Sequence, residues 1–99
     1  MESLGELLPE LLRRWKLAEG VAGWRAVDEW PAAAGPRIAQ RTRAVEFREG
    51  ILVVEVQGSV WRHELGFLKR DLLKRIRERA GSSRITDLKF ITARGGIQR

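Results

Sequence analysis

Two strand-like runs at the centre of the chain constrain the fold more than any other feature of the sequence. Residues 43–48 and 51–57 are separated only by Glu49 and Gly50, and a two-residue connection that ends in glycine is typical of a tight β-hairpin. The turn fixes the register, and the expected pairs are Phe47 with Leu52 and Val45 with Val54 on one face, and Arg48 with Ile51 and Glu46 with Val53 on the other. One face is apolar and the other mixed, which predicts a sheet covered on one side.

Residues 59–81 are predicted to form one long helix. Ser59 is a favourable N-cap and Gly81 a favourable helix end. Between them an apolar stripe at helical spacing predicts a face that packs in the core, formed by Trp61, Leu65, Leu68, Leu72 and Ile76. Residues 84–92 then have the composition of a third strand, so the long helix crosses from the second strand to the third and lies on the sheet.

A first helix is predicted near the N-terminus, where Ser3 and Glu6 match the S-x-x-E capping box. Leucines follow at helical spacing up to Trp15. Pro9 lies inside this pattern and is expected to kink the helix or to mark its beginning. We expect this stripe in the core; if the helix packs loosely, the stripe becomes an exposed surface for docking another protein.

A second helix is expected after Gly20 and Gly23, because two glycines close together tend to interrupt a helix. This second helix carries Trp24, Val27 and Trp30 on one face. Large aromatic side chains on such a face bury much apolar surface. We therefore expect both tryptophans in the core.

Together these elements predict an α+β fold in the order α-α-β-β-α-β, with a three-stranded sheet and helices on one side. Residues 37–42 are expected to add one short helical turn after Pro36. A chain of 99 residues has the size of one domain. We expect a single domain over residues 1–99, with a core over about 4–92 and a basic tail over 93–99.

The side chains exclude most classes of enzyme. The chain has no cysteine and one histidine, His63, so neither a disulfide nor a multi-histidine metal site can form. No G-x-x-x-x-G-K-[ST], G-x-G-x-x-G or G-x-S-x-G motif is present. We therefore expect a protein that is not an enzyme and has no catalytic residue, metal, cofactor or small-molecule substrate.

The sequence also predicts a location. The N-terminus lacks the positively charged start of a secretory signal, and the apolar run at residues 51–54 is too short to span a bilayer. We expect a cytoplasmic protein that does not engage a membrane.

Positive charge is concentrated in the C-terminal part of the chain. The formal net charge of +6 is made up of −1 over residues 1–58, +4 over 59–81 and +3 over 82–99. A clustered excess of this kind is typical of proteins that bind phosphate backbones. The distribution therefore favours nucleic acid as a partner.

One face of the predicted long helix is the candidate binding surface. If residues 59–81 form a continuous helix, His63, Arg70, Lys74 and Arg77 lie opposite the core stripe, with Phe67 beside them. Cationic side chains bind phosphates by releasing counterions, and an aromatic ring stacks on an unpaired base. Arginines near the hairpin are expected to add charge, which gives a candidate nucleic-acid-binding set of Arg41, Arg43, Arg48, His63, Phe67, Arg70, Lys74 and Arg77. The alternative is an ordinary solvated face, with its cations near a helix C-terminus.

Several motifs of the chain resemble the DciA family. Residues 30–42 match its W-x-x-x-x-G-x-x-[IL]-A-x-x-[TS] stretch, and residues 50–56 match its G-x-L-x-V-x-V strand. Residues 59–65 match its S-x-W-x-x-E-L helix start, and residues 72–76 fit its L-L-x-x-[LI] continuation. The resemblance covers roughly residues 5–92. The matched residues look structural, so they do not locate a binding site.

Members of that family are bacterial loaders or operators of the DnaB-type replicative helicase, with a KH-like domain, affinity for DNA and no ATP hydrolysis of their own. The resemblance implies a KH-like domain here and a non-enzymatic adaptor in DNA replication. Its partners would be DNA, with single-stranded or tailed forms preferred, and the replicative helicase, which would place it at the nucleoid. Two alternatives stay open: an RNA-binding KH-like module, and a protein–protein adaptor without a nucleic-acid role.

Overall fold

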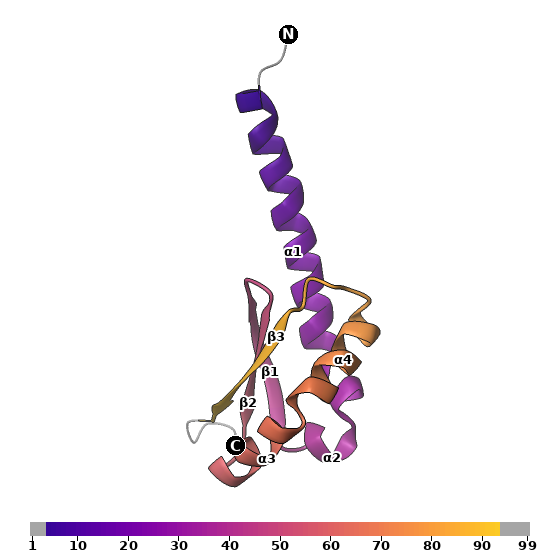
Figure 1. Cartoon of the computed structure of the whole chain (residues 1–99), viewed down its shortest axis with the longest axis vertical. Coiled ribbons are helices and arrows are strands. Elements are labelled where there is room, and N and C mark those ends of the chain that lie inside the picture. The colour runs from indigo at the N-terminus through magenta and orange to yellow at the C-terminus, as the bar shows by residue number, and fades with distance from the viewer. Residues whose placement is uncertain (1–3, 94–99) are drawn as a thin grey trace.

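The computed structural model describes residues 4–93, and for residues 4–8 it describes the backbone only. The predicted capping box at Ser3 lies outside the described residues. Figure 1 shows the elements in chain order: α1 (Leu4–Ala34), α2 (Pro36–Ala39), β1 (Thr42–Arg48), β2 (Ile51–Val56), α3 (Ser59–Phe67), α4 (Lys69–Ala80) and β3 (Asp87–Thr92). The fold is α+β with a three-stranded mixed sheet, as the sequence predicts. The KH-like label and the single domain over residues 1–99 stay predictions.

The predicted hairpin is confirmed. Strands β1 and β2 are antiparallel, and the turn has positive φ at Glu49 (51°) and Gly50 (86°). A Cβ on residue 50 would lie 2.6 Å from Thr86 Oγ1, so only glycine fits there. Three of the four expected pairs occur: Phe47 with Leu52, Arg48 with Ile51, and Glu46 with Val53.

The fourth expected pair, Val45 with Val54, is wrong. The register shifts between Ala44 and Glu46, so Ala44 faces Val54 and Val45 is the extra residue of a β-bulge. The inward position therefore passes to the smaller Ala44, which packs against the core, while Val45 remains 38% exposed. The alternation of polar and apolar residues does not reveal this bulge, because Ala44 and Val45 are both apolar and either could take the inward position.

The third strand is confirmed as β3, which lies parallel to β2. It begins at Asp87 rather than at residue 84. The preceding segment is tied to the hairpin turn instead, since the Thr86 N–H donates to the Gly50 carbonyl at 2.7 Å and Ile85 is fully buried.

The expected division of the N-terminal part into two helices is wrong. Helix α1 is continuous over 31 residues and passes through Gly20 and Gly23. A glycine inside a helix costs only about 1 kcal/mol relative to alanine. At Gly23 the cost is offset by packing, because residue 23 faces Phe47 too closely for a side chain. Pro9 also lies within the helix and does not mark its beginning.

The predicted long helix over residues 59–81 is divided at Leu68 into α3 and α4. The Leu68 N–H donates to the Leu65 carbonyl at 3.0 Å, a tight i→i−3 turn, and Leu68 has φ −99° and ψ 4°. The break lets α3 pack on β3 and α4 pack on α1. As a result Leu68, expected in the core, is 43% exposed.

The ends of this helical pair are partly as expected. Gly81 ends α4 in the left-handed conformation, with its N–H donating to the Arg77 carbonyl at 2.9 Å. Ser59 is the first residue of α3 rather than its N-cap, and Gly58, with φ 93°, takes the capping position. The predicted turn after Pro36 is present as α2.

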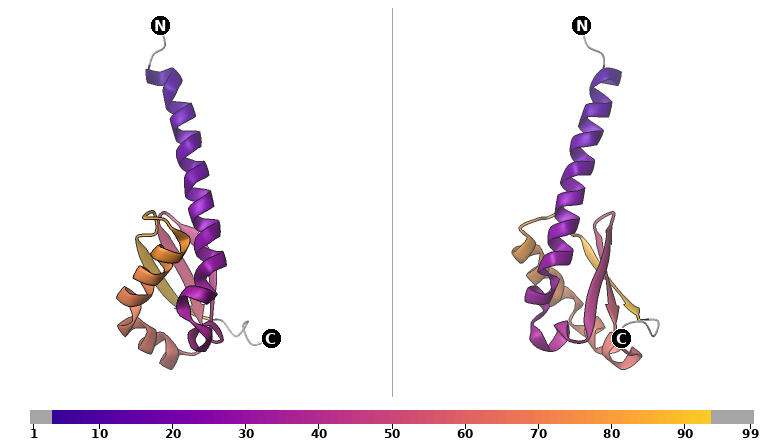
Figure 2. Two further views of the ribbon diagram at one scale, coloured as in Figure 1. Left: turned by 90° about the vertical axis from the view of Figure 1, so that its right-hand side faces the viewer. Right: turned by 180° about the vertical axis from the view of Figure 1, so that it is seen from behind.

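The core lies between the sheet and the helices α1 and α4, which cover the same face of the sheet (Figure 2). Its largest fully buried side chains are Trp30, Leu52, Leu65, Leu72, Ile76, Ile85, Leu88, Val54 and Val56. Trp30 is 1% exposed, and its Nε1–H donates to Thr42 Oγ1 at 3.0 Å. Thr42 Oγ1 in turn donates to the Ile38 carbonyl at 2.9 Å, so the indole N–H and the threonine hydroxyl are both satisfied.

The other tryptophans do not all follow the prediction. Trp61 is half-buried against the core, but Trp24 and Trp15 are 67% and 52% exposed, so their expected burial is wrong. For Trp15 the cause is visible in Figure 1, where the N-terminal half of α1 projects beyond the sheet. The molecule is correspondingly elongated, with extents of 59 × 26 × 19 Å. Trp24 lies two residues from the buried Ala22 and two from the buried Ala26, so it is on another side of α1 than the residues that face the core. Within residues 4–93, no helix has both the length and the apolar character that crossing a bilayer requires.

Candidate nucleic-acid interface

Helix α4 carries a row of three cations on its outer face. Arg70, Lys74 and Arg77 follow at spacings of four and three residues, which places them on one side of a helix and opposite the buried Leu72 and Ile76. All three are exposed. Among the described residues, none of the three takes part in an ion pair with a carboxylate. This row of cations depends only on α4, so the break at Leu68 leaves it intact.

The remaining arginines of α4 have a different task. Arg79 Nε lies 3.0 Å from Glu29 Oε1 of α1, and Arg75 Nη1 donates to the Ala33 carbonyl of α1 at 3.5 Å. Arg75 also pairs with Asp71 on its own helix at 3.3 Å. Helix α4 therefore divides its cations. Arg75 and Arg79 fasten α1, Lys69 pairs with Asp87 of β3 at 3.1 Å, and the other three face solvent.

An exposed ring pair lies at the end of α3. The rings of His63 and Phe67 are one helical turn apart, with centroids 5.2 Å apart and planes at 89°. Phe67 is 76% exposed and Val60, on the same side of α3, is 75% exposed, whereas Leu65 on the opposite side is buried. Phe67 precedes Arg70 by three residues across the Leu68 break. The ring pair and the row of cations are thus adjacent in the chain, but they are not parts of one straight helix face.

Arg41 belongs to another cluster. Its guanidinium carbon lies 5.6 Å from the centre of the Trp61 ring, and that of Arg37 lies 5.7 Å from it. The contact explains why Trp61 is only half-buried, since one part of the ring packs on the core and another receives cations. Arg37 was not among the predicted site residues, because a cation–π contact between α2 and α3 has no signature in the spacing of the sequence.

The hairpin arginines lie on the far face of the sheet. Arg48 is paired with Ile51 and Arg43 with Glu55, and these positions alternate with the buried Leu52, Val54 and Val56. Each arginine also has a carboxylate partner, because Arg43 Nη2 lies 3.3 Å from Glu55 and Arg48 Nη2 lies 2.6 Å from Glu46. The sheet therefore separates these two arginines from the row on α4, and the structure does not bring the predicted set together as one surface.

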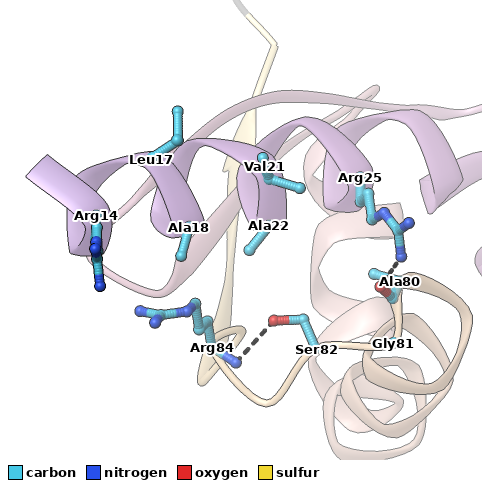
Figure 3. A pocket seen from close by; sticks show the side chains of 10 residues that line it. All are labelled: Arg14, Leu17, Ala18, Val21, Ala22, Arg25, Ala80, Gly81, Ser82 and Arg84. Carbon is cyan, nitrogen blue, oxygen red and sulfur yellow. Dashed lines mark hydrogen bonds between the residues drawn. The ribbon is translucent and has the colours of Figure 1, made fainter.

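A groove beside α1 was not predicted. It has a volume of about 460 Å³ and lies between α1 and the segment that follows α4 (Figure 3). Its apolar lining residues include Ala18, Ala22 and Ala80, and its three charged lining residues are Arg14, Arg25 and Arg84. The Arg25 Nη1–H donates to the Ala80 carbonyl at 3.3 Å, while the Arg84 guanidinium lies 5.9 Å from the centre of the Trp15 ring.

Comparison with known proteins gives a consistent result. The model of the family described as "Dna[CI] antecedent, DciA" matches residues 3–90. A UPF0232 protein of Corynebacterium glutamicum is 30% identical over 89 residues, which are 90% of this chain and 50% of that protein. UPF0232 proteins of Mycolicibacterium paratuberculosis and Mycobacterium tuberculosis are 28% and 26% identical over the same share of this chain, and 49% and 48% of their own lengths are covered. The chain thus spans about half the length of the curated relatives that it matches.

Proposed function

This chain belongs to the DciA family, and we propose that it is a non-enzymatic adaptor of bacterial DNA replication that binds DNA and helps to load or operate the DnaB-type replicative helicase. It would act in the cytoplasm at the nucleoid. Family membership supports the role in replication, because the match extends over residues 3–90, from the start of α1 into the last strand β3.

One observation carries the DNA-binding part of the proposal: Arg70, Lys74 and Arg77 are exposed in a row on α4, without a carboxylate partner among the described residues. An arginine that is already paired gains less from a phosphate, because the internal pair must be exchanged. Three cations that have no internal partner attract a polyanion without first breaking an ion pair. Their binding releases the counterions that are condensed on the nucleic acid.

The ring pair of α3 supports single-stranded DNA as the preferred form. Phe67 presents most of its surface to solvent, and His63 holds it edge-on at 5.2 Å. Exposed aromatic rings beside cations are the usual platform for unpaired bases, which stack on the ring while the backbone follows the charges. Bases in a duplex are already stacked on one another, so their faces are not accessible to an aromatic side chain.

The test is a salt titration of DNA binding by fluorescence anisotropy, with single-stranded and tailed oligonucleotides. The triple variant R70A/K74A/R77A should reduce the slope of log K against log salt concentration by roughly two to three units. The matched control is R43A/R48A/K89A, which removes the same charge from the far face of the sheet. The control should leave the slope nearly unchanged.

The two variants also define the contrary results. If the control flattens the slope and the α4 triple variant does not, the phosphates follow the sheet and the assignment to α4 is wrong. An RNA competitor that displaces the protein more readily than the same DNA sequence would favour an RNA-binding module. Co-elution with the replicative helicase of the same organism tests the partner separately, and a chain that binds DNA but never co-elutes would contradict the adaptor role.

A further inference from the structure

The groove between α1 and the segment after α4 has charges of one sign only. We call it the arginine groove, because Arg14, Arg25 and Arg84 line it (Figure 3). Among the described residues that line it, none is acidic. Arg14 lies 3.6 Å from Glu10, which is outside the lining, and such an exposed pair contributes little. A groove lined by one sign of charge concentrates ligands of the opposite sign, so its ligand is expected to be anionic.

The lining between the arginines is apolar. Ala18 and Ala22 lie one helical turn apart on α1, and Ala80 at the end of α4 also lines the groove. Leu17 and Val21 form a rim on α1 and are 68% and 52% exposed. Methyl side chains on the floor let another helix approach closely, and the rim offers it aliphatic surface. The ligand is therefore expected to have an apolar face as well as negative charge.

The cations lie at the ends of this apolar floor. Arg14 and Arg25 are at opposite ends of the groove in Figure 3, and they are eleven positions apart on α1, a rise of about 16 Å. Arg84 extends toward the Arg14 end, where its guanidinium carbon is 5.9 Å from the centre of the Trp15 ring. The expected ligand thus carries its negative charges at two places, with an apolar stretch of about three helical turns between them.

Two of the arginines are held in place by the protein itself. Arg25 Nη1–H donates to the Ala80 carbonyl at 3.3 Å, which leaves its other N–H groups free. The backbone N–H of Arg84 donates to Ser82 Oγ at 3.0 Å, so the segment that carries Arg84 is fixed locally (Figure 3). Cations that are already positioned lose less conformational entropy when a ligand binds.

We propose that the arginine groove is the docking site for an acidic amphipathic helix of a protein partner. The helix would place aliphatic side chains over Ala18 and Ala22 and carboxylates near Arg14 and Arg25, a helix-in-groove contact. A nucleic-acid strand fits less well. It carries a phosphate at every nucleotide and would set charges over the apolar floor, whereas a helix can keep its charges at its ends.

The test starts from a phage-displayed library of random peptides of about 16 residues, which is slightly more than four helical turns. The library is selected on the whole chain in the absence of nucleic acid. Enriched peptides should carry acidic residues at two places about eleven positions apart, with aliphatic residues or alanine between them. The most enriched peptide is then synthesised with a fluorescent label, and anisotropy measures its dissociation constant, expected to be of order micromolar.

Two triple variants separate the groove from general positive charge. R14A/R25A/R84A should weaken binding of the labelled peptide roughly tenfold or more, because it removes three exposed ion pairs. The matched control is R70A/K74A/R77A, which removes the same charge from the outer face of α4 and should change the affinity less than about twofold. Circular dichroism and urea denaturation check that each variant keeps the fold.

Two single substitutions test shape and pairing. Ala18→Phe fills the floor of the groove and should abolish peptide binding, whereas Val60→Phe, at an exposed position of α3, should not. Arg25→Glu should weaken binding of the parent peptide. A peptide with lysine in place of the carboxylates at one end should then bind Arg25→Glu more tightly than it binds the parent chain. The end at which lysine restores binding gives the direction of the helix.

The contrary results are equally definite. Enriched peptides without acidic residues at two places overturn the proposal, and so does a peptide that binds R14A/R25A/R84A as tightly as it binds the parent chain. Folded Ala18→Phe that still binds the peptide also contradicts it. If R14A/R25A/R84A instead lowers the salt slope of single-stranded DNA binding and no peptide depends on the groove, the occupant is nucleic acid. Since peptide binding is measured without DNA, its outcome does not depend on the proposed DNA site on α4.

Discussion

Gly23 of α1 lies so close to Phe47 of β1 that a Cβ on residue 23 would be 2.8 Å from Phe47 Cδ2 and 3.1 Å from Phe47 Cβ. The distance to Phe47 Cβ matters because this atom is bonded directly to the backbone and cannot move unless β1 moves. Helix α1 and strand β1 can approach each other this closely because residue 23 has no side chain. The neighbouring Gly20 has nothing within 4 Å of its would-be Cβ.

Replacing Gly23 with alanine should therefore destabilise the fold. Overpacking of this kind costs about 1–3 kcal/mol, and the gain in helix propensity returns only about 1 kcal/mol, so a net loss of up to about 2 kcal/mol is expected. Gly20→Ala is the matched control, with the same propensity gain and no clash, and it should raise stability by about 0.5–1 kcal/mol. Urea denaturation measures both. Equal effects of the two substitutions would show that the Phe47 contact relaxes freely.

The hydrogen bond from Trp30 to Thr42 leads to a second prediction. Thr42→Val keeps the shape of the side chain but removes the acceptor for the buried Trp30 Nε1–H and the donor to the Ile38 carbonyl. An unsatisfied buried donor costs about 1–3 kcal/mol, and a loss of that size is expected in urea denaturation. Thr92→Val is the control, because Thr92 is exposed and accepts only from Arg62. A loss no larger than that of the control would mean that the indole finds another partner.

The local features of the fold were predictable from sequence, and the tertiary ones were not. The hairpin followed from Glu49-Gly50, since a two-residue turn fixes its own geometry and the register of the pairs next to it, although the bulge at Val45 further along the strand did not follow. The continuity of α1 did not, because Gly23 is selected by its contact with Phe47, which is 24 positions away. Glycine can interrupt a helix or can permit another element to pack closely against it, and the sequence alone does not distinguish these two roles.

The candidate site shows the same division. The row Arg70, Lys74 and Arg77 follows from an eight-residue span of one helix, so the sequence predicts it although the helix breaks two residues earlier. Whether an arginine is free or paired is decided by distant elements. Arg79 meets Glu29 from 50 positions away, and helical periodicity does not show that partner.

Phe67 provides a test of stacking that is independent of charge. Phe67→Ala should weaken binding of single-stranded DNA by roughly 5- to 150-fold, the range for losing one stacked base. The salt slope should stay constant, because the ring releases no counterions. Val60→Ala, equally exposed on the same side of α3, should change affinity less than twofold. If both substitutions weaken binding equally, the patch acts by burying apolar surface and not by stacking.

Arg77 and Arg79 are two residues apart on α4 and should have different roles, Arg77 in DNA binding and Arg79 in holding α4 against α1. Arg79→Ala removes the 3.0 Å pair with Glu29 that joins α4 to α1. A double-mutant cycle with Glu29→Ala should give a coupling energy of about 0.2–1 kcal/mol, the range for partly exposed pairs. Arg77→Ala should show no coupling to Glu29, yet it should lower the salt slope of DNA binding by about one unit, which Arg79→Ala should not. The contrast follows from geometry alone, since one cation faces α1 and the other faces solvent. Should Arg79→Ala flatten the slope as much as Arg77→Ala, the phosphate path would run along the α1 side of α4, and the row of three would not be its centre.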